Sequence, residues 1–305
     1  MSAAESQPLL PSSAQRRTAS SASAHLELHR GVGSFTSKAR ALALRETYRE
    51  PLAELLATFL LVLIGDGVVA QTVLSGGANG SWLGINFAWA GAVFLGSYLA
   101  GPISGSHINP AVTVSLAAFG GFPWSKVPGY LVAQMLGGFL GAATVYANYY
   151  EQIDLYEGGL RTVPGHYAVK PTAGIFSTYP TPGSSPSSSF ISELTASFIL
   201  MLGISAISSS RSKHLSASSA FAVFILMICI GSSFGWQTGY AINAARDLAP
   251  RCFAFFVYGG EVFSAGHHYW WIPVVAPIFG CCLGKSLWAL IVGEKEEEEA
   301  QGILV

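Results

Sequence analysis

Residues 104–114 read Ser-Gly-Ser-His-Ile-Asn-Pro-Ala-Val-Thr-Val, and residues 238–248 read Thr-Gly-Tyr-Ala-Ile-Asn-Ala-Ala-Arg-Asp-Leu. Gly, Ile, Asn and one Ala of the two phrases fall in register, 134 residues apart. Each phrase predicts a helix start, with Asn109 or Asn243 as the N-cap and Pro110 at the first helical position of the first copy. Two such starts at matching points of two halves indicate a membrane protein built from an internal repeat.

The composition favours a membrane protein over a globular one. The 305 residues are 51% hydrophobic and only 11% charged, and the mean hydropathy is +0.45. Basic residues are not interleaved with aromatic ones, so nucleic acid is not expected as a partner. The four cysteines show no disulfide or metal-ligand spacing, and we expect no metal and no cofactor.

Six apolar segments are long enough to cross about 30 Å of hydrocarbon, which needs about 20 residues. They are residues 51–74, 83–103, 127–149, 190–209, 217–235 and 270–292. The segments that follow the two asparagines, 109–119 and 243–254, are too short to cross. Irregular backbone at membrane depth is tolerated where it lines a cavity. The sequence therefore predicts an all-α membrane protein with six transmembrane helices, two re-entrant half-helices and inverted three-helix repeats.

This pattern divides the chain into a membrane domain and two tails. We expect a disordered cytoplasmic tail over residues 1–47, rich in Ser and Ala, and an acidic cytoplasmic tail over 294–305. The domain between them covers residues 48–293, with repeat one at about 48–149, an outward loop at 150–189 and repeat two at about 190–293.

Basic residues set the expected orientation. Lys126, Arg211, Lys213 and Lys295 fall on the same side as the basic N-terminal tail. The positive-inside rule then places both termini in the cytoplasm. Asn79, in an Asn-Gly-Ser pattern on an outward loop, is a candidate glycosylation site close to a membrane span.

The two asparagines indicate what the repeated phrases can do. An N-cap asparagine directs its side-chain oxygen to the N–H groups of the next turn, which leaves its NH₂ group free to face a lumen. The positive ends of two helix dipoles then converge at one level and penalise cations and hydrated protons.

The paired boxes Asn109-Pro110-Ala111 and Asn243-Ala244-Ala245, their spacing and the six spans resemble the aquaporin (major intrinsic protein) family over about residues 50–293. The resemblance implies an aquaporin-like channel domain. It also implies that the intramembrane carboxylates Glu54 and Glu193 hydrogen-bond the non-helical loops and orient the carbonyls lining the pore. His107 would flank the inner lumen or be satisfied against the loop backbone. A proton relay through the two carboxylates is the alternative for a transporter.

Four further residues resemble the constriction of the glycerol facilitator branch: Trp89, Gly231, Tyr240 and Arg246. The resemblance implies that Gly231 leaves room, that the two aromatic rings form an apolar corner for an alkyl backbone, and that Arg246 faces the hydroxyls. Asp247 also resembles this branch, and residues 48–54 look like its fungal members.

Ala244 departs from the family pattern, which has proline there. Proline fixes φ and lacks an N–H at a position where that N–H would be unpaired. Alanine is a good helix former, so we expect the half-helix to persist and the presentation of Asn243 to loosen modestly at most.

The resemblance implies a passive channel that conducts glycerol and other small uncharged solutes together with water and excludes ions and protons. The alternatives are a channel mainly for water or for another neutral solute such as urea or a protonated weak acid, a proton-coupled transporter, and a scaffold with a vestigial pore. No ATP-binding or catalytic-triad motif is present, so an enzyme is not expected. The expected partners are the permeants, the lipid bilayer of the plasma membrane and three further copies in a homotetramer.

Overall fold

The computed structural model describes residues 42, 46–165, 170–209 and 219–293, and all of its regular elements are helical. The first helix is Glu46–Leu74. It is followed by α2 (Trp82–Ser104), α3 (Pro110–Phe119), η1 (Trp124–Lys126), α4 (Val127–Glu157), η2 (Ala173–Ile175), α5 (Pro186–Ser208), α6 (Ser219–Phe234), α7 (Ala244–Tyr258), α8 (Glu261–His268), η4 (Tyr269–Trp271), α9 (Ile272–Trp288) and a π-helical end, η5 (Ala289–Gly293).

The predicted spans are helices. Five helical segments of the described chain are long and apolar enough to cross a membrane: Glu46–Leu74, Trp82–Ser104, Trp124–Glu157, Pro186–Ser208 and Glu261–Val292. The sixth predicted span, 217–235, corresponds to α6, of which 16 residues are described. The all-helical fold class is therefore confirmed.

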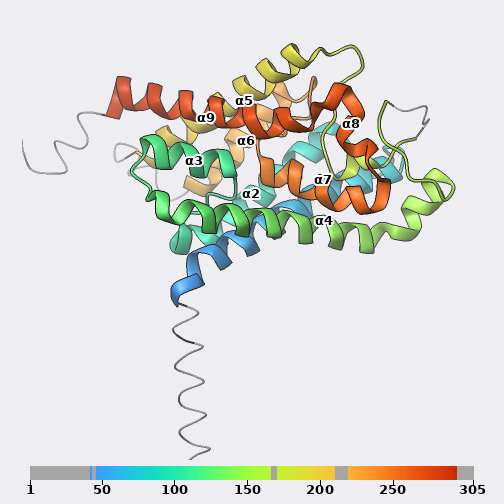
Figure 1. The fold of residues 1–305 in the computed structure, drawn as a ribbon, viewed down its shortest axis with the longest axis horizontal. Coiled ribbons are helices and arrows are strands. Elements are labelled where there is room, and N and C mark those ends of the chain that lie inside the picture. The colour runs from blue at the N-terminus through green and yellow to red at the C-terminus, as the bar shows by residue number, and fades with distance from the viewer. Residues whose placement is uncertain (1–41, 43–45, 166–169, 210–218, 294–305) are drawn as a thin grey trace, which may run out of the picture. The chain divides into compact units, whose positions relative to one another are not determined.

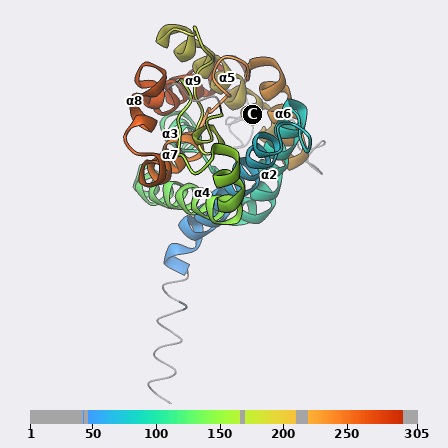
Figure 2. The ribbon, with the colours of Figure 1, turned by 90° about the vertical axis from the view of Figure 1, so that its right-hand side faces the viewer.

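The two short segments after the asparagines form half-helices, as predicted. Asn109 is the N-cap of α3 and Asn243 is the N-cap of α7, both with extended backbone. Figure 1 shows α3 and α7 one after the other between α9 and α4, and both short helices contact those two long ones. In Figure 2, α5 and α9 lie together on one side of the bundle while α2 and α6 lie together on another.

Glycines at matching positions let the long helices of each half approach closely. A Cβ on Gly137 of α4 would lie 2.3 Å from the Leu55 carbonyl oxygen, and a Cβ on Gly280 of α9 would lie 2.3 Å from the Leu194 oxygen. Each glycine is followed four residues later by another that also meets the partner helix backbone. Small residues at this spacing are typical of helix packing in membranes. The packing therefore repeats the same contact in both halves.

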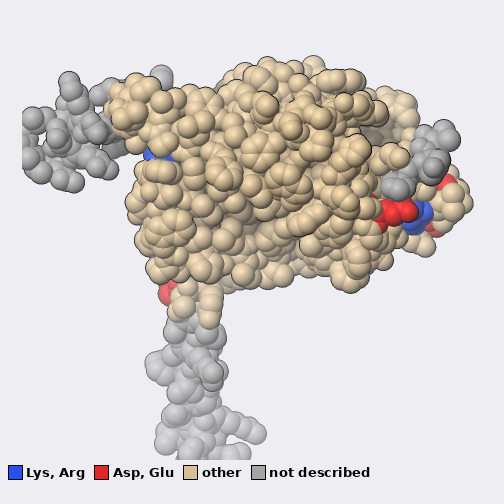
Figure 3. All heavy atoms as spheres, turned by 45° about the horizontal axis from the view of Figure 1, so that its top comes forward, with Lys and Arg blue, Asp and Glu red and all other residues tan. Residues whose placement is uncertain are grey.

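The outer surface of the bundle is apolar. Large hydrophobic side chains such as Leu56, Leu95, Val132, Ile191 and Phe279 are exposed. Figure 3 shows a face that is almost free of charged side chains, with the coloured charges near its margins. In water such a surface would be a liability, whereas lipid chains cover it without penalty. The outer surface of the bundle is therefore suited to contact with the lipid chains of a bilayer.

Several helix boundaries differ from the prediction, among them the start of α5 at Pro186, and one helix is additional. Helix α4 continues to Glu157, so the first eight residues of the predicted loop 150–189 are helical. Helix α8 was not predicted; its apolar residues are few, and it is interrupted by non-helical backbone at 265–267. The first helix extends to Glu46, two residues before the predicted domain start at 48. Residues 294–305 and nearly all of the predicted tail 1–47 lie outside the described residues.

The close glycine contacts predict a stability difference between two Gly→Ala variants. Gly137→Ala should destabilise the protein by about 1–3 kcal/mol, because its Cβ would press on helix backbone. Gly91→Ala is the matched control, since nothing lies within 4 Å of a Cβ at that position of α2. Thermal unfolding of the purified protein in detergent measures both, and equal melting temperatures would contradict the packing account.

Candidate functional site

A cavity of about 450 Å³ runs along the inside of the bundle. On α2 its wall is a ladder of residues about one turn apart, namely Trp89, Val93, Ser97 and Gly101. At about 1.5 Å of rise per residue this ladder spans about 18 Å. Residues of α5, of α6 and of both asparagine-capped loops also line the cavity.

The two asparagines lie in the wall of this cavity and link the two loops. Oδ1 of Asn109 accepts from the Ala111 N–H at 2.9 Å, and Oδ1 of Asn243 accepts from the Ala245 N–H at 2.9 Å. Nδ2 of Asn109 donates to the Ile242 carbonyl at 2.8 Å, and Nδ2 of Asn243 donates to the Ile108 carbonyl at 2.8 Å.

These crossed hydrogen bonds correct one expectation. The NH₂ groups are not wholly free, because each gives one hydrogen to the loop of the other half. Buried carbonyls of non-helical backbone need donors, and the opposite asparagine supplies one. One N–H of each amide remains for the cavity.

The loops before α3 and α7 share an unusual backbone. Gly105 and Gly239 have positive φ, and so do the matched pairs Ser106 with Tyr240 and Ile108 with Ile242. Positive φ is a genuine strain for a β-branched residue and is of order 1–3 kcal/mol for each such position. Such a conformation persists only where its surroundings over-determine it.

Glu54 supplies those surroundings for the first loop. Its carboxylate, fully buried, accepts from the backbone N–H groups of His107 at 2.8 Å and Ile108 at 2.6 Å. Ser104 Oγ and Gln134 Nε2 donate to the same carboxylate at 2.6 and 2.8 Å. Four donors from three elements thus meet at one carboxylate.

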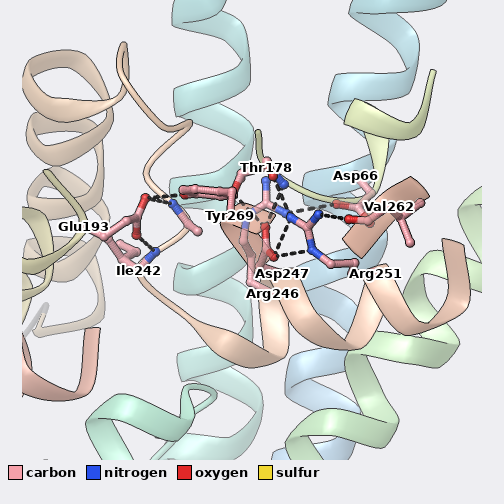
Figure 4. Close-up of polar contacts among 10 residues, drawn as sticks. Asp66, Thr178, Glu193, Ile242, Arg246, Asp247, Arg251, Val262 and Tyr269 are labelled. Atoms are coloured by element: carbon pink, nitrogen blue, oxygen red, sulfur yellow. Dashed lines mark hydrogen bonds and ion pairs between the residues drawn. The ribbon is translucent and has the colours of Figure 1, made fainter. Parts of the chain in front are cut away.

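Glu193 occupies the matching place in the second half. It accepts from the N–H groups of Ala241 at 2.9 Å and Ile242 at 2.7 Å, and Tyr269 Oη donates to it at 3.3 Å (Figure 4). Neither glutamate lines the cavity. Their hydrogen bonds therefore act on the loops and not on a solute.

His107 does line the cavity, and its ring is also satisfied by the protein. Nδ1 lies 3.1 Å from Thr113 Oγ1, and the rings of Phe122 and Tyr130 pack against it at centroid distances of 4.7 and 5.0 Å. His107 therefore lies in the cavity wall, and the partner of its ring is the Thr113 side chain and not the loop backbone expected as the alternative.

Three of the four expected constriction residues meet at one end of the cavity. The Arg246 guanidinium carbon lies 4.0 Å from the centroid of the Trp89 ring, and Tyr240 lines the same end. Each of the three is at most 9% exposed. The indole face of Trp89, the phenol of Tyr240 and the guanidinium of Arg246 thus lie together at this end of the cavity.

Gly231, the fourth residue, does not line this cavity, and the expected open room beside it is filled. A Cβ on Gly231 would lie 2.6 Å from Asn86 Oδ1 and 2.8 Å from Tyr240 Cζ. The absence of a side chain therefore lets the Tyr240 ring and the Asn86 amide pack against α6. Gly231 is thus a close neighbour of Tyr240 and not part of the cavity wall.

Asp247 lies behind the constriction in a buried network. Its Oδ2 accepts from the N–H and Oγ1 of Thr178, both at 2.7 Å, and its Oδ1 accepts from Arg251 Nη2 at 2.8 Å (Figure 4). Arg251 also donates to the carbonyls of Thr178 and Val262 at 2.6 and 2.7 Å. The network fastens the 173–185 loop and α8 to the start of α7.

Tyr179, in that loop, packs under Arg251, with the guanidinium carbon 4.7 Å from its ring centroid. Burial raises the pKa of the Tyr179 phenol to about 12, against the opposing effect of the Arg251 charge. The phenol is therefore neutral at physiological pH.

Sequence reasoning missed several residues of the site. Neither Arg251 nor Asp66 was assigned a role from the sequence, although Asp66 Oδ1 lies 3.6 Å from Arg246 Nη1. Gln134, Asn86 and Thr178 were not singled out. A polar residue within an apolar span is the signal that could have found the first two of these three.

The remaining expected positions are structurally ordinary. Ala244 begins α7 without a break, and the cap hydrogen bonds of Asn243 are intact. Asn79 is exposed, with its N–H donated to Ser75 Oγ at 3.0 Å, while Ser81 caps α2.

The site and fold match known proteins. The family model described as major intrinsic protein matches residues 41–288. The chain is 46% identical over 251 residues to an aquaglyceroporin-9 from Botryotinia fuckeliana, covering 81% of this chain and 54% of that one, so it spans about half of that relative. A probable aquaglyceroporin-2 from Gibberella zeae is 46% identical over 252 residues, covering 82% and 74%.

A solved structure is also similar. The X-ray structure of the aquaglyceroporin from Plasmodium falciparum superposes with a TM-score of 0.72 at 30% identity, covering 82% of this chain and 99% of that one. The helical frame, the paired asparagine caps and these matches agree: the chain is an integral membrane protein that belongs to the major intrinsic protein family.

Proposed function

We propose that this protein is a passive channel for glycerol and other small uncharged solutes together with water. The observation that carries the proposal is the cavity that joins the Trp89–Tyr240–Arg246 end to the two asparagines. A polyol at this end would meet an apolar ring face on one side and guanidinium donors on another, which suits a molecule with an alkyl backbone and several hydroxyls. Two relatives and the similar solved structure are aquaglyceroporins, which supports the assignment.

The asparagine level would exclude charge. The N-termini of α3 and α7 meet there, so the positive ends of both helix dipoles oppose cations. The remaining N–H of each asparagine amide would donate to a passing oxygen, whereas a hydrated proton or a cation would meet these donors and the positive ends of both helices. Neutral hydroxylated solutes are the class that such a lining admits.

The glutamates would support the pathway without touching the solute. By holding the N–H groups of residues 107, 108, 241 and 242, they fix the loops whose carbonyls and asparagines line the cavity. This role accounts for two intramembrane carboxylates without a proton relay, because their oxygens are occupied by backbone donors.

The wider setting is also part of the proposal. The distribution of basic residues supports cytoplasmic termini, with the Lys126 end of the bundle facing inward and the 158–185 segment facing outward. Residues 1–47 and 294–305 would be cytoplasmic tails flanking the channel domain at 48–293. Residence in the plasma membrane and a homotetramer with one pathway per subunit rest on the family resemblance, and Asn79 remains a candidate for glycosylation.

Solute flux into proteoliposomes tests the proposed function. After a glycerol gradient is applied, vesicles that contain the protein should shrink and then reswell faster than empty vesicles. The initial rate should rise in proportion to glycerol concentration and should not depend on a pH gradient. Stopped-flow light scattering measures this, with water and urea compared in the same vesicles. Saturation or a need for a pH gradient would favour a coupled transporter, and passage of water alone would favour a water channel.

A second prediction concerns the residue behind Tyr240. Gly231→His should reduce glycerol permeability more than water permeability, because even its Cβ would force the Tyr240 ring or the Asn86 amide to move. Gly91→Ala, in open surroundings on α2, is the control and should leave both permeabilities unchanged. An equal loss of both permeabilities in Gly231→His would contradict the proposed constriction.

A further inference from the structure

Asp66 is a buried carboxylate that has no role in the proposed function described above. It lies in the first helix and is fully buried. Neither of its carboxylate oxygens has a hydrogen-bond partner within the described part of the chain. A carboxylate at membrane depth is expensive and needs a partner. The cation that faces it is Arg246, whose Nη1 lies 3.6 Å from Asp66 Oδ1 (Figure 4).

Arg246 has no other carboxylate available among the described residues. Its neighbour Asp247 is occupied by Thr178 and Arg251, which donate to both of its oxygens. Arg246 Nη1 itself makes no hydrogen bond to any described residue. Two aspartates and two arginines thus form a buried layer in which each arginine has its own aspartate.

Gly65, the residue before Asp66, allows the Trp89 ring to pack against the first helix, and Trp89 in turn contacts Arg246. A Cβ on Gly65 would lie 2.2 Å from the Trp89 ring, so the indole can rest against the first helix only because residue 65 is glycine. The guanidinium of Arg246 then stacks on that indole at 4.0 Å. Adjacent residues of one helix therefore fix both partners of the constriction.

Comparison of the two halves of the internal repeat shows that the helical fold does not require a carboxylate at the position of Asp66. Glu54 and Glu193 lie at equivalent points of the first helix and α5, and by the same spacing the counterpart of Asp66 is Ser205. The acid is present only in the half that faces Arg246. The position of Asp66 is therefore explained by its pairing with Arg246 and not by the repeated helical framework.

We infer that Asp66 is a positioning residue for the constriction, which holds the Arg246 guanidinium against Trp89 and away from the open cavity. This inference rests on the proposed function, and it identifies Asp66 as a residue that affects the selectivity of the proposed channel. Without the carboxylate, the guanidinium loses its attraction to the first helix and extends toward acceptors in the cavity. The opening that remains admits water more readily than glycerol.

Flux in proteoliposomes of the full chain tests this inference. Asp66→Asn should lower the glycerol permeability about fivefold and the water permeability less than about twofold, a size typical of one lost pairwise coupling. Asp66→Glu keeps the charge and should retain more of the glycerol flux than Asp66→Asn. Thr58→Val removes a buried hydroxyl that has no described partner from the same helix, and it should match the unaltered protein.

A double-variant comparison separates positioning from a merely structural role. In the Arg246→Gln background, Asp66→Asn should cause no further change in the glycerol-to-water ratio, because the charge it positions is gone. An equal effect in both backgrounds, or an unchanged ratio in Asp66→Asn, overturns the inference. If Asp66→Asn alone does not fold, recovery of folding in the double variant supports the pairing, and continued loss contradicts it. Absence of glycerol flux in the unaltered protein would instead overturn the proposed function.

Discussion

The conformation of the two asparagine-capped loops depends on hydrogen bonds that their strained backbone donates to two buried glutamates. Ile108 and Ile242 adopt positive φ, which a β-branched residue avoids, and each donates its N–H to a fully buried carboxylate. Hydrogen bonds to a charged acceptor contribute about 1.5–3 kcal/mol each, enough to offset the strain at such a position. The carbonyls of the same two residues are then turned toward the opposite loop, where the asparagines bond them. One constraint thus sets the shape of both loops and the distance between them.

The rest of the bundle serves to bring these loops together. Gly137 and Gly280 let the long helices of each half pack backbone to backbone, and this places each glutamate beside its loop. The buried pair of Asp247 and Arg251 fastens the segment around Thr178 over the start of α7. Each half repeats the glycine contact and the glutamate brace, whereas three of the four residues of the charged layer, Arg246, Asp247 and Arg251, lie on α7 and have no charged counterpart on α3. The symmetric parts form the frame, and on the proposed function the asymmetric parts would determine which solutes fit.

Much of this could be predicted from the sequence, because it follows from local rules. Asparagine before a short apolar run predicts a cap, and a run of about 20 apolar residues predicts a span. The contacts between distant segments could not be predicted in this way. The crossed bonds of the asparagines, the pairing of Asp66 with Arg246 and the packing of Tyr240 against Gly231 all depend on how the helices are placed. The expectation of open space beside Gly231 was wrong for this reason. A glycine in the sequence does not indicate which neighbouring side chain fills the space that it leaves.

The most direct test of this account is the permeability of the glutamate variants. Glu54→Gln and Glu193→Gln keep the side-chain shape but set an NH₂ group against backbone donors. With Glu261→Gln at an exposed position of α8 as the control, stopped-flow measurement on folded, reconstituted protein should find both glycerol and water permeability reduced by about tenfold or more, the equivalent of about 1.4 kcal/mol. Permeabilities equal to those of the unaltered protein would contradict the claim that these two carboxylates hold the pathway open.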